Sequence, residues 1–476
     1  MSLKDYWPFP EFRAGQERVL EQIEAAWESH DVIVVRAPTA FGKEPLSVAV
    51  QNWQLDRGLS AAITVPNNAL RDQVTSNWGH LKTIRAMKDY WLEKYNMSEL
   101  EFRRRVYKYG TKDSEYNRDK REVKRVGNPI CVNYHSYIAH KLQRNVVIVD
   151  EAHLLLNTLQ DMAAKKIWHH KHKYPLNLKT LAQVKRWVDS LDSLGPGVER
   201  LQEELESLTP ATLVEIGTEL YRGEPRSCLK LIPLSVENHK PIFWPRKTQK
   251  IVLVSATIGP EDVKRMGLGT RRTAWIDAPS PIPAARRAIR RDYVGSLAYH
   301  KQDENLDALV AKIRELRDLH EGNGFVHASY ALARKIREKL RGEDWAMFHS
   351  QDSTNKREAY AKFTEIPASE RKVMIGSGFS EGIDMKYDIA SWQLIAKVPY
   401  PSLADAAMRW VATKQASYYN WLVSQDIMQA CGRVCRAPDD IGITYIADSS
   451  FEGWLERSRH QLPLWFLEAL EDKHGA

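Results

Sequence analysis

The sequence has few cysteines, and they form no paired cluster. The four are Cys131, Cys228, Cys431 and Cys435, and no two of them make a CxxC pair. This arrangement encodes neither a disulfide framework nor a zinc site. We interpret Cys431 and Cys435, which are four residues apart, as packing residues. The cysteine usage fits a reducing compartment.

Long apolar runs are also lacking. No run approaches the roughly 18 residues that a membrane-spanning helix needs. The first twelve residues, MSLKDYWPFPEF, have no apolar core of the kind found in signal peptides. Internal repeats and low-complexity tracts are missing as well. We therefore expect a protein of the cytoplasm that has no membrane partner.

The hydrophobic content of the chain is sufficient for globular domains, and its net charge is positive. It has 476 residues, 43% of them hydrophobic, which is too long for one core and favours two to four domains. The net charge of +8 suits a polyanionic partner. Fifteen tryptophans are many for this length. Most should lie in the core, but exposed aromatic rings on a basic protein can also stack on nucleic-acid bases.

Short apolar runs recur along the chain with helical stretches between them. Four fall before residue 260 and four after residue 320, in the segments DVIVVRA, SAAITV, VVIVD, KIVLVSAT, GFVHAS, KVMIGSG, SWQLIAKVP and GITYIAD. Such Val- and Ile-rich runs alternating with helices are typical of parallel sheets covered on both faces. The sequence therefore predicts an α/β protein of two lobes. The expected hinge is residues 276–289, where three prolines in a five-residue span oppose helix and sheet.

Two long intervals interrupt the first lobe. Residues 101–126 of the first interval carry ten Lys or Arg against five Asp or Glu. This run is either a solvated helix face or a surface that contacts phosphates. The second interval, residues 154–245, is helical by pattern in NLKTLAQVKRWVDSLDSL and VERLQEELESL. We therefore expect both insertions to be mainly helical.

The segment VVRAPTAFGKEPLSVAV, residues 34–50, predicts a buried strand, a turn of small residues and the start of a helix. Backbone N–H groups of such a turn and the positive end of the helix can hold phosphates, while Lys43 neutralises their charge. Ala37 stands where glycine is common, and Thr39 could add a hydroxyl. The usual pattern continues with Ser or Thr after the lysine, whereas this chain has Glu44.

A pair of carboxylates ends a second apolar strand. In VVIVDEAH, residues 146–153, Asp150 could hold the water shell of Mg²⁺ and Glu151 could polarise an attacking water. Such a pair can also be an ordinary helix cap. The spacing to the lysine loop and the presence of VSAT at residues 254–257 favour the catalytic interpretation.

The segment IMQACGRVCRAPDD carries three polar residues at helical spacing. Gln429, Arg433 and Arg436 are at positions i, i+4 and i+7, which puts them on roughly one face of a helix. A face of this kind on the second lobe can place arginines against the γ-phosphate of a nucleotide bound to the first lobe.

Taken together, these motifs resemble those of superfamily 2 helicases, and more narrowly the XPD/DinG group of DNA helicases. The motifs occur in family order over nearly the whole chain, as FRAGQ (12–16), APTAFGKE (37–44), TVPNNALRDQ (64–73), VNYHS (132–136), DEAH (150–153), VSAT, GFSEGIDM (378–385), KVPYPS (397–402), QACGRVCRAPDD (429–440) and IADSSF (446–451). FSEGID, PYPS and the QACGRVCRAPDD segment are the specific ones.

The resemblance implies two RecA-like lobes with ATP in the cleft between them. It divides the chain into a first RecA-like domain (1–80, 128–154 and 246–277), a basic helical insertion (81–127), a helical arch-like insertion (155–245) and a second RecA-like domain (278–476). The basic insertion lies where the family has its iron–sulfur domain. It contains no cysteine, and Cys131 alone cannot hold a cluster. We therefore expect no iron–sulfur cluster.

The resemblance also assigns roles to residues. The implied catalytic residues are Lys43, Asp150, Glu151, Gln429, Arg433 and Arg436, with Asp150 and Glu44 at the metal. The implied nucleotide-binding residues are Arg13 and Gln16 near the adenine, Ala37, Pro38, Thr39, Ala40, Phe41, Gly42, Lys43 and Glu44 in the loop, and Glu381, Gly382 and Asp384, which couple the nucleotide to the strand. Ser255 and Thr257 would link the site to the DNA path.

Glu44 leaves three alternatives open. It could ligate Mg²⁺, because carboxylates are good ligands for hard cations. It could instead repel the triphosphate and weaken hydrolysis, since like charges about 4 Å apart cost roughly 4 kcal/mol at an effective dielectric near 20. It could also turn away and pair with a nearby Arg or Lys.

The expected function is that of an ATP-dependent DNA helicase or translocase that uses Mg²⁺ and moves 5′ to 3′ on single-stranded DNA. Its partners would be single-stranded DNA and tailed or forked duplexes, and the expected state is a monomer in a bacterial or phage-infected cell. One alternative is a nucleic-acid binding clamp in which Glu44 impairs ATP hydrolysis. Another is an RNA-remodelling ATPase.

Overall fold

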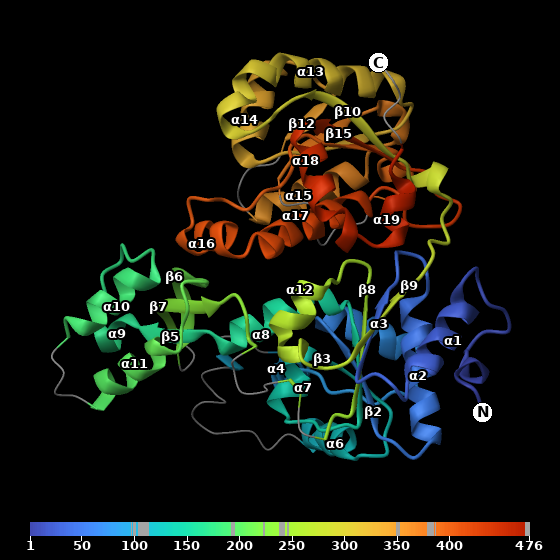
Figure 1. Cartoon of the computed structure of the whole chain (residues 1–476), viewed down its shortest axis with the longest axis vertical. Coiled ribbons are helices and arrows are strands. Elements are labelled where there is room, and N and C mark those ends of the chain that lie inside the picture. Colours follow the sequence, from blue (N-terminus) through green and yellow to red (C-terminus); the bar gives the residue numbers. More distant parts are fainter. Residues whose placement is uncertain are drawn as a thin grey trace.

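Two six-stranded sheets form the centres of two lobes that lie one above the other (Figure 1). The computed structural model describes residues 1–96, 98, 101–102, 114–191, 196–221, 224–237, 243–244, 247–348, 353–377, 385 and 387–471. None of the helices in these ranges has the length and apolar character needed to cross a membrane. The predicted pair of parallel-sheet lobes is confirmed.

The first sheet is parallel throughout and buried on both faces. Its strands, in spatial order, are β3 (Ile130–Asn133), β2 (Ala61–Val65), β4 (Val146–Asp150), β8 (Lys250–Ser255), β1 (Val32–Arg36) and β9 (Thr273–Asp277). Along β1, Val32 and Val34 belong to the core on one face, and Ile33 and Val35 to the core on the other. This double burial explains why the strands read as continuous apolar runs.

The second sheet has the same character. Its strands, in spatial order, are β10 (Ile289–Gly295), β15 (Ile443–Asp448), β14 (Trp392–Ile395), β11 (Gly324–His327), β13 (Val373–Gly376) and β12 (Ala346–Phe348). The eight apolar runs of the sequence correspond to β1, β2, β4, β8, β11, β13, β14 and β15. Sequence analysis missed the sheet-edge strands β3, β9, β10 and β12, which are short or interrupted by polar residues.

Helices cover both faces of each sheet. In the first lobe and the first insertion they are α1 (Gln16–Ala26), α2 (Lys43–Asp56), α3 (Asn68–Asn77), α4 (Met87–Tyr95), α6 (Ser114–Lys124), α7 (Tyr134–Ala139), α8 (Leu155–Ala163) and α12 (Pro260–Val263), with short turns η1 (Leu3–Tyr6), η2 (Ala152–Leu154) and η3 (Lys264–Leu268). In the second lobe they are α13 (Gln302–Leu319), α14 (Tyr330–Lys339), α15 (Ser353–Thr364), α16 (Ala406–Lys414), α17 (Ala416–Cys431), α18 (Ser450–Ser458) and α19 (Leu464–Ala469).

The second insertion is not mainly helical, which corrects the prediction for residues 155–245. The two quoted helical segments do form α10 (Leu181–Asp189) and α11 (Pro196–Glu206), and α9 (His169–His172) is a single turn. Beside them lies an antiparallel sheet of β5 (Lys165–Trp168), β7 (Glu224–Pro233) and β6 (Thr212–Tyr221). Val214-Glu215-Ile216 and Leu229-Lys230-Leu231 alternate apolar and polar residues, and this period-two pattern is the strand signal that was overlooked.

The first insertion is partly described. Its helices α4 and α6 pack through Tyr90 and Tyr116, whose ring centroids are 5.7 Å apart, and the Tyr90 hydroxyl donates to Asp119. Residues 103–113, which contain half of the predicted basic run, lie outside the described residues. The two interpretations of that run therefore stay open.

The connection between the lobes follows the proline-rich segment. β9 ends at Asp277 and β10 begins at Ile289. Between them the chain forms a single short turn, η4 (Ala284–Arg287). It crosses from the lower to the upper lobe at the side opposite the second insertion (Figure 1).

Candidate functional site

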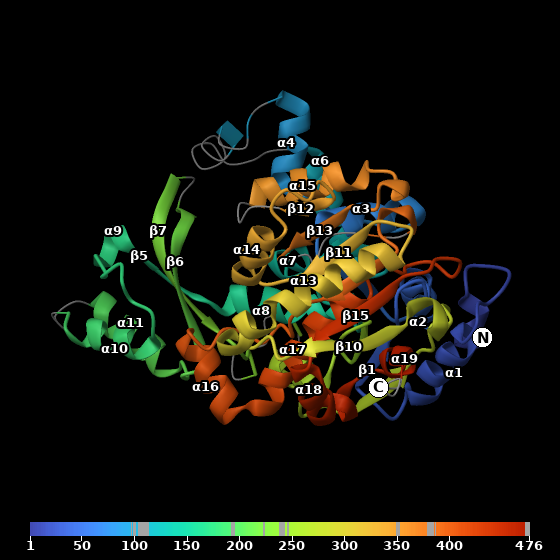
Figure 2. The ribbon, with the colours of Figure 1, turned by 90° about the horizontal axis from the view of Figure 1, so that it is seen from above.

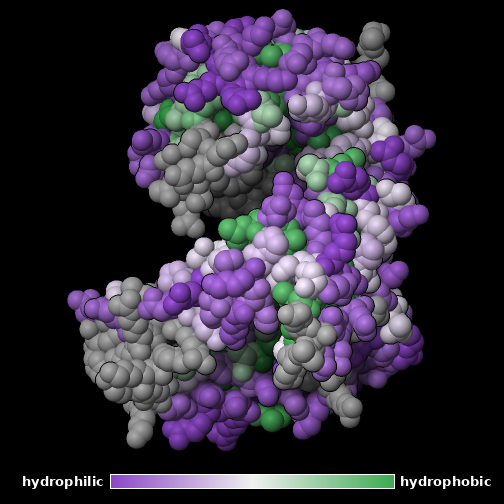
Figure 3. Space-filling model, turned by 90° about the vertical axis from the view of Figure 1, so that its left-hand side faces the viewer, coloured by the Kyte–Doolittle hydropathy of each residue, from purple (hydrophilic) through white to green (hydrophobic). Residues whose placement is uncertain are grey.

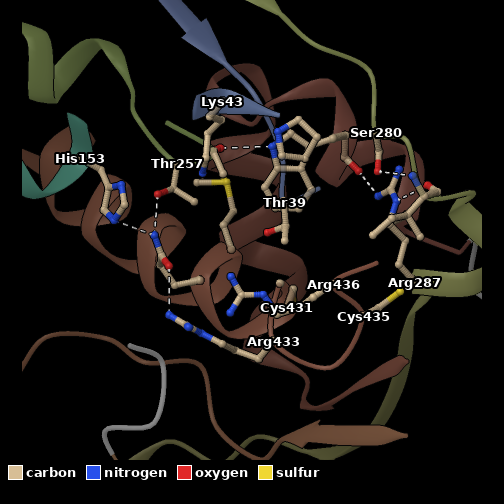
Figure 4. Close-up of a pocket in the computed structure, with 18 of the residues that line it drawn as sticks. Thr39, Lys43, His153, Thr257, Ser280, Arg287, Cys431, Arg433, Cys435 and Arg436 are labelled. Carbon is tan, nitrogen blue, oxygen red and sulfur yellow. Dashed lines mark hydrogen bonds between the residues drawn. The ribbon is translucent and has the colours of Figure 1, made fainter. Parts of the chain in front are cut away.

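A cavity of about 570 Å³ lies between the two lobes and is lined by residues of both (Figure 4). The first lobe contributes Pro38, Thr39, Lys43, Asn67, Glu151, His153, Leu154, Ala256 and Thr257. The connecting segment and the second lobe contribute Ser280, Ile282, Arg287, Ile289, Met428, Gln429, Cys431, Gly432, Arg433, Cys435, Arg436, Trp465 and Ala469. The sequence-predicted lysine, one of the two acids, the glutamine and both arginines therefore meet around one space.

The loop between β1 and α2 has the shape of a phosphate-binding turn. Gly42 adopts φ 94°, which favours glycine, and a Cβ there would come within 2.8 Å of the Gln16 side chain. Gln16 donates to the Phe41 carbonyl at 2.5 Å, and Arg13 donates to the Ala40 carbonyl at 3.3 Å. Both residues thus brace the loop from outside the cavity. Helix α2 begins at Lys43, so the amino end of this helix faces the site.

Lys43 and Glu151 form an ion pair inside the cavity, with Nζ 2.6 Å from Oε1. Burial tends to raise the pKa of Glu151, but the charge and hydrogen bond of Lys43, together with the charge of Arg436, outweigh burial, and the pKa is lowered. Glu151 is thus held as a carboxylate. Its backbone is left-handed, with φ 49°, a strained conformation that is frequent at functional sites.

Asp150 lies at the end of β4 behind Glu151. Its carboxylate is only slightly exposed and accepts a hydrogen bond from the Glu151 N–H at 3.0 Å. Burial, followed by the neighbouring negative charge of Glu151, raises the pKa of Asp150 to about 7. A nearby cation would relieve both effects. The described part of the chain contains no group of three or more His, Cys, Asp or Glu residues arranged to hold a metal ion by themselves.

A chain of polar side chains connects the two lobes beside the ion pair (Figure 4). His153 bonds through Nδ1 to the Ser255 hydroxyl at 2.7 Å, and its Nε2 lies 3.0 Å from the Gln429 amide nitrogen. Gln429 also donates to Thr257 at 2.8 Å. Burial lowers the pKa of His153 to about 4, so the ring is neutral and accepts from Gln429. Sequence analysis quoted DEAH without giving His153 a role.

Arg433 and Arg436 do not lie on the helix that carries Gln429, which corrects the prediction of one continuous helical face. Helix α17 ends at Cys431 with Gly432 as its cap, and both arginines follow in the next loop. They still line the cavity, and Arg433 donates to the Gln429 side chain at 3.4 Å. Gly432 caps the helix with an ordinary negative φ of −83°, and the loop that follows brings both arginines to the cavity.

Glu44 points away from the cavity. Its carboxylate accepts hydrogen bonds from the Trp78 indole at 2.6 Å and from the Asn77 amide at 2.9 Å. This corresponds to the third alternative for Glu44, except that its partners are an indole and an amide instead of a cation. The geometry gives no support to the prediction that Glu44 is a metal ligand.

Glu44 instead lines a separate cavity of about 980 Å³, which we call the aromatic cavity. Trp7 and Phe12 stack there with ring centroids 5.4 Å apart. The residues lining the aromatic cavity are Trp7, Phe9, Pro10, Glu11, Phe12, Arg13, Gln16, Gly42, Glu44, Pro45, Gln73, Asn77 and Trp78. Arg13 and Gln16, predicted near the adenine, are thus neighbours of the phosphate loop and of a pocket with flat apolar walls.

The remaining predicted residues divide into three groups. Ala37 and Phe41 are buried below the loop, and Ser255 and Thr257 are buried at the lobe interface. Ala40 has a left-handed backbone, with φ 65°. Glu381, Gly382 and Asp384 lie outside the described residues. Trp465 carried no signal in the sequence, because it is far from every motif, and Ser280 lies in the predicted hinge without a predicted role at the site.

A second set of buried polar contacts joins the lobes next to the cavity. Asp262 of α12 accepts from the Trp421 indole at 2.8 Å and from Gln425 at 3.0 Å, both on α17. Arg265 donates to Gln415 at 2.7 Å and lies 3.5 Å from the centre of the Tyr418 ring. Asp262 is fully buried, and burial raises its pKa to about 7.

We expect the variant Asp262→Asn to remove a contribution to the free energy of unfolding that depends on pH. The unfolded Asp262 ionises near pH 4 and the folded one near pH 7, so between these values the unfolded chain has lost a proton that the folded chain keeps. This contribution therefore falls as pH rises, by about 1.4 kcal/mol per pH unit, and levels off above pH 7. Glu261 and Arg265 are the charged neighbours, with opposite effects on the pKa.

Scanning calorimetry at pH 5 to 8 measures this effect. The melting temperature of the wild type minus that of the variant should decrease with pH up to about pH 7. A difference that does not change with pH would contradict a raised pKa for Asp262.

Comparisons with known proteins identify relatives of both sequence and fold. Residues 313–469 match a family model described as a helicase C-terminal domain. The ATP-dependent DNA helicase YoaA of Escherichia coli (strain K12) is 25% identical over 235 residues, which cover 46% of this chain and 36% of YoaA. The match thus spans about a third of the length of this relative.

Two solved structures share the architecture. A structure of S. tokodaii Xpd4 is 14% identical, with 93% of this chain and 97% of that chain covered and a TM-score of 0.55. A structure of an XPD helicase is also 14% identical, with 95% and 98% covered and a TM-score of 0.61. At this level of identity the likeness shows a common fold. The C-terminal family match, the partial similarity to YoaA and the common fold agree with the resemblance to XPD/DinG helicases that the sequence motifs indicate.

Proposed function

We propose that this protein is an ATP-dependent helicase or translocase that moves 5′ to 3′ on single-stranded DNA and unwinds tailed or forked duplexes. One observation carries the proposal. Lys43 and Glu151 of the first lobe face Gln429, Arg433 and Arg436 of the second across a single cavity. Both halves of the site come from one chain, which supports action as a monomer.

The first lobe binds the nucleotide. The N–H groups of the loop and the amino end of α2 receive the phosphates, and Lys43 leaves Glu151 to neutralise the β- and γ-phosphates. Glu151, then freed from the ion pair, orients and deprotonates the attacking water. Arg13 and Gln16 place the base beside the aromatic cavity, whose stacked rings offer it a flat surface.

Magnesium fits the residues present. In nucleotide sites Mg²⁺ is commonly held by one or two carboxylates together with the phosphates, so a complete protein cage is not needed. Asp150 is the residue that would hold it, because a cation would stabilise its buried carboxylate. The ion would supply neutralisation of charge between the β- and γ-phosphates.

The second lobe supplies the remaining residues of the ATP site and couples ATP binding and hydrolysis to movement of the lobes. Arg433 and Arg436 stabilise the charge that develops on the transferred phosphoryl group. Gln429 touches both His153 and Thr257, so closure of the lobes on ATP is transmitted to residues next to Glu151. Opening after hydrolysis changes the grip of the two lobes on the strand and produces a step.

ATP turnover measured with and without oligo-dT tests this function. We expect turnover that rises with oligo-dT and is abolished in Lys43→Ala, because the phosphates lose their only lysine ligand from the loop. Strand separation on duplexes with a 5′ or a 3′ tail gives the direction. Unwinding from a 3′ tail alone would refute movement from 5′ to 3′, and stimulation by oligo-U in preference to oligo-dT would favour the RNA-remodelling alternative.

A variant of Glu44 distinguishes an ATP-hydrolysing helicase from the alternative, a clamp that binds nucleic acid but no longer hydrolyses ATP. Because Glu44 is held by Trp78 and Asn77, we expect Glu44→Ser to keep ATP turnover within about threefold of wild type. The loss of two hydrogen bonds to a carboxylate should lower the free energy of unfolding by about 1–3 kcal/mol. Turnover and thermal melting check both parts. A loss of turnover in Glu44→Ser would instead indicate that Glu44 takes part in metal binding.

A further inference from the structure

The buried hydroxyl of Tyr134 bonds to the backbone of the acid pair. It donates to the Asp150 carbonyl and lies 3.2 Å from the Glu151 carbonyl. A hydroxyl has a single proton, so the two carbonyls share it. These carbonyls belong to the peptide groups before and after the Cα of Glu151. One side chain therefore holds both of the peptide groups that set the backbone angles of Glu151.

The backbone that Tyr134 contacts has an uncommon conformation. Glu151 is left-handed, with φ 49° and ψ 46°, although it carries a Cβ. Such a conformation persists only where the surrounding structure holds it. The Asp150 carboxylate accepts from the Glu151 N–H at 3.0 Å, and the Leu154 N–H donates to the Glu151 carbonyl at 2.9 Å. Together with the Tyr134 hydroxyl, these bonds keep residue 151 in the conformation from which its carboxylate reaches Lys43.

Tyr134 does not touch the space in which a nucleotide would lie. Its side chain is fully buried, and it is not one of the residues that line the cavity between the lobes. Solvent can enter the hollow that Figure 3 shows between the second lobe and the part of the molecule below it, but it does not reach Tyr134. Burial, followed by the negative charges of Asp150 and Glu151, raises the pKa of Tyr134, so the hydroxyl keeps its proton. Tyr134 can therefore act on the reaction only through the backbone of Asp150 and Glu151.

The position of the Tyr134 ring depends on its packing between the two insertions. Helix α7 begins at Tyr134, directly after strand β3, which follows the first insertion. In Figures 1 and 2 this helix lies between α6 of the first insertion and α8, which leads into the second. Phe243, near the end of the second insertion, meets the Tyr134 ring edge-on with the ring centroids 6.0 Å apart, and its centroid is 5.0 Å from that of Tyr137. These ring contacts confine the hydroxyl to the place where it meets the two carbonyls.

We propose that Tyr134 is a positioning residue for ATP hydrolysis, because its hydroxyl holds Glu151 in the left-handed conformation that directs the carboxylate to the attacking water. The inference rests on the proposed function, in which Glu151 activates that water. A small displacement of the carboxylate slows proton transfer, since a general base must lie within hydrogen-bond reach of the proton it takes. Binding of ATP does not need the hydroxyl, because Lys43 and the loop before α2 contact the phosphates. Tyr134 therefore contributes to the rate of hydrolysis and not to the affinity for ATP.

ATP turnover of full-length Tyr134→Phe with saturating oligo-dT tests this role. The variant keeps the ring and its contact with Phe243 and removes only the hydroxyl. We expect kcat to fall about 10- to 100-fold, while the affinity for a fluorescent ATP analogue stays within about twofold of wild type. Tyr137→Phe is the matched control, because this tyrosine lies on the same helix, packs on the same ring and has a hydroxyl that makes no hydrogen bond to the acid pair. The control should turn over ATP as wild type.

A double variant separates positioning from a general structural effect. Adding Tyr134→Phe to Glu151→Gln should leave the residual turnover unchanged, because the effects of residues that act as a unit do not add. A further loss of about tenfold in the double variant, or normal turnover in Tyr134→Phe, would overturn the inference and leave the proposed function standing. Absence of turnover in the wild type with oligo-dT would remove both.

Thermal melting verifies that the variants are folded at the assay temperature. If Tyr134→Phe is not, Phe243→Leu gives the same readout, because it keeps the hydroxyl but loosens the ring that carries it. Its kcat should fall at an unchanged affinity for the ATP analogue. Turnover equal to that of the wild type in Phe243→Leu would then contradict the positioning role.

Discussion

Replacing Glu151 with glutamine is expected to lower ATP turnover by about 10²–10⁴-fold, because the amide cannot take a proton from the attacking water. The amide oxygen can still accept the hydrogen bond from Lys43, whose Nζ lies 2.6 Å from Oε1 of Glu151. The left-handed backbone of residue 151 suits glutamine no worse than glutamate. Nucleotide binding should therefore persist, and the variant should accumulate as a complex with intact ATP and DNA.

Single-turnover hydrolysis and binding of a fluorescent ATP analogue separate these two effects. Glu456→Gln, an exposed glutamate on α18 far from the cavity, is the matched control and should behave as wild type. Retention of more than about a tenth of the turnover in Glu151→Gln would mean that another group activates the water.

The second large effect is expected at Arg433. Arginines supplied across a cleft contribute about 10³–10⁵-fold to phosphoryl transfer in related chemistry, so Arg433→Ala should reduce turnover by at least 10³-fold. ATP affinity should change far less, because Lys43 and the loop of the first lobe bind the ground state. Arg433→Lys should not restore turnover, since an ammonium cannot present the planar fork of a guanidinium.

Variants of two other arginines serve as comparisons for Arg433→Ala. Arg341→Ala removes an exposed arginine of the second lobe outside the cavity and should leave turnover unchanged. Arg436 lines the same cavity, and its charge lowers the pKa of Glu151, so Arg436→Ala should also impair turnover. Normal turnover in Arg433→Ala would remove this residue from the site and leave Arg436 as the arginine of the second lobe.

Much of the fold could be predicted from the sequence because its signals are local. Eight strands appear as apolar runs, and the loop before Lys43 and the acids after β4 are contiguous motifs. Gly42 supplies the left-handed turn of the loop locally, although Arg13 and Gln16 also brace the loop from farther along the chain. The hairpin β6–β7 was missed although its signal was also local, because the flanking helices suggested a mainly helical insertion.

The sequence by itself determined the two lobes, the residues of the phosphate loop and the acid pair, since each depends on patterns within about ten residues. Only the tertiary structure decided where Glu44 points, because its partner Trp78 lies 34 residues away and competes with the metal position for the same side chain. The same holds for Gln429 and His153, which are 276 residues apart and meet only after both lobes have folded and docked.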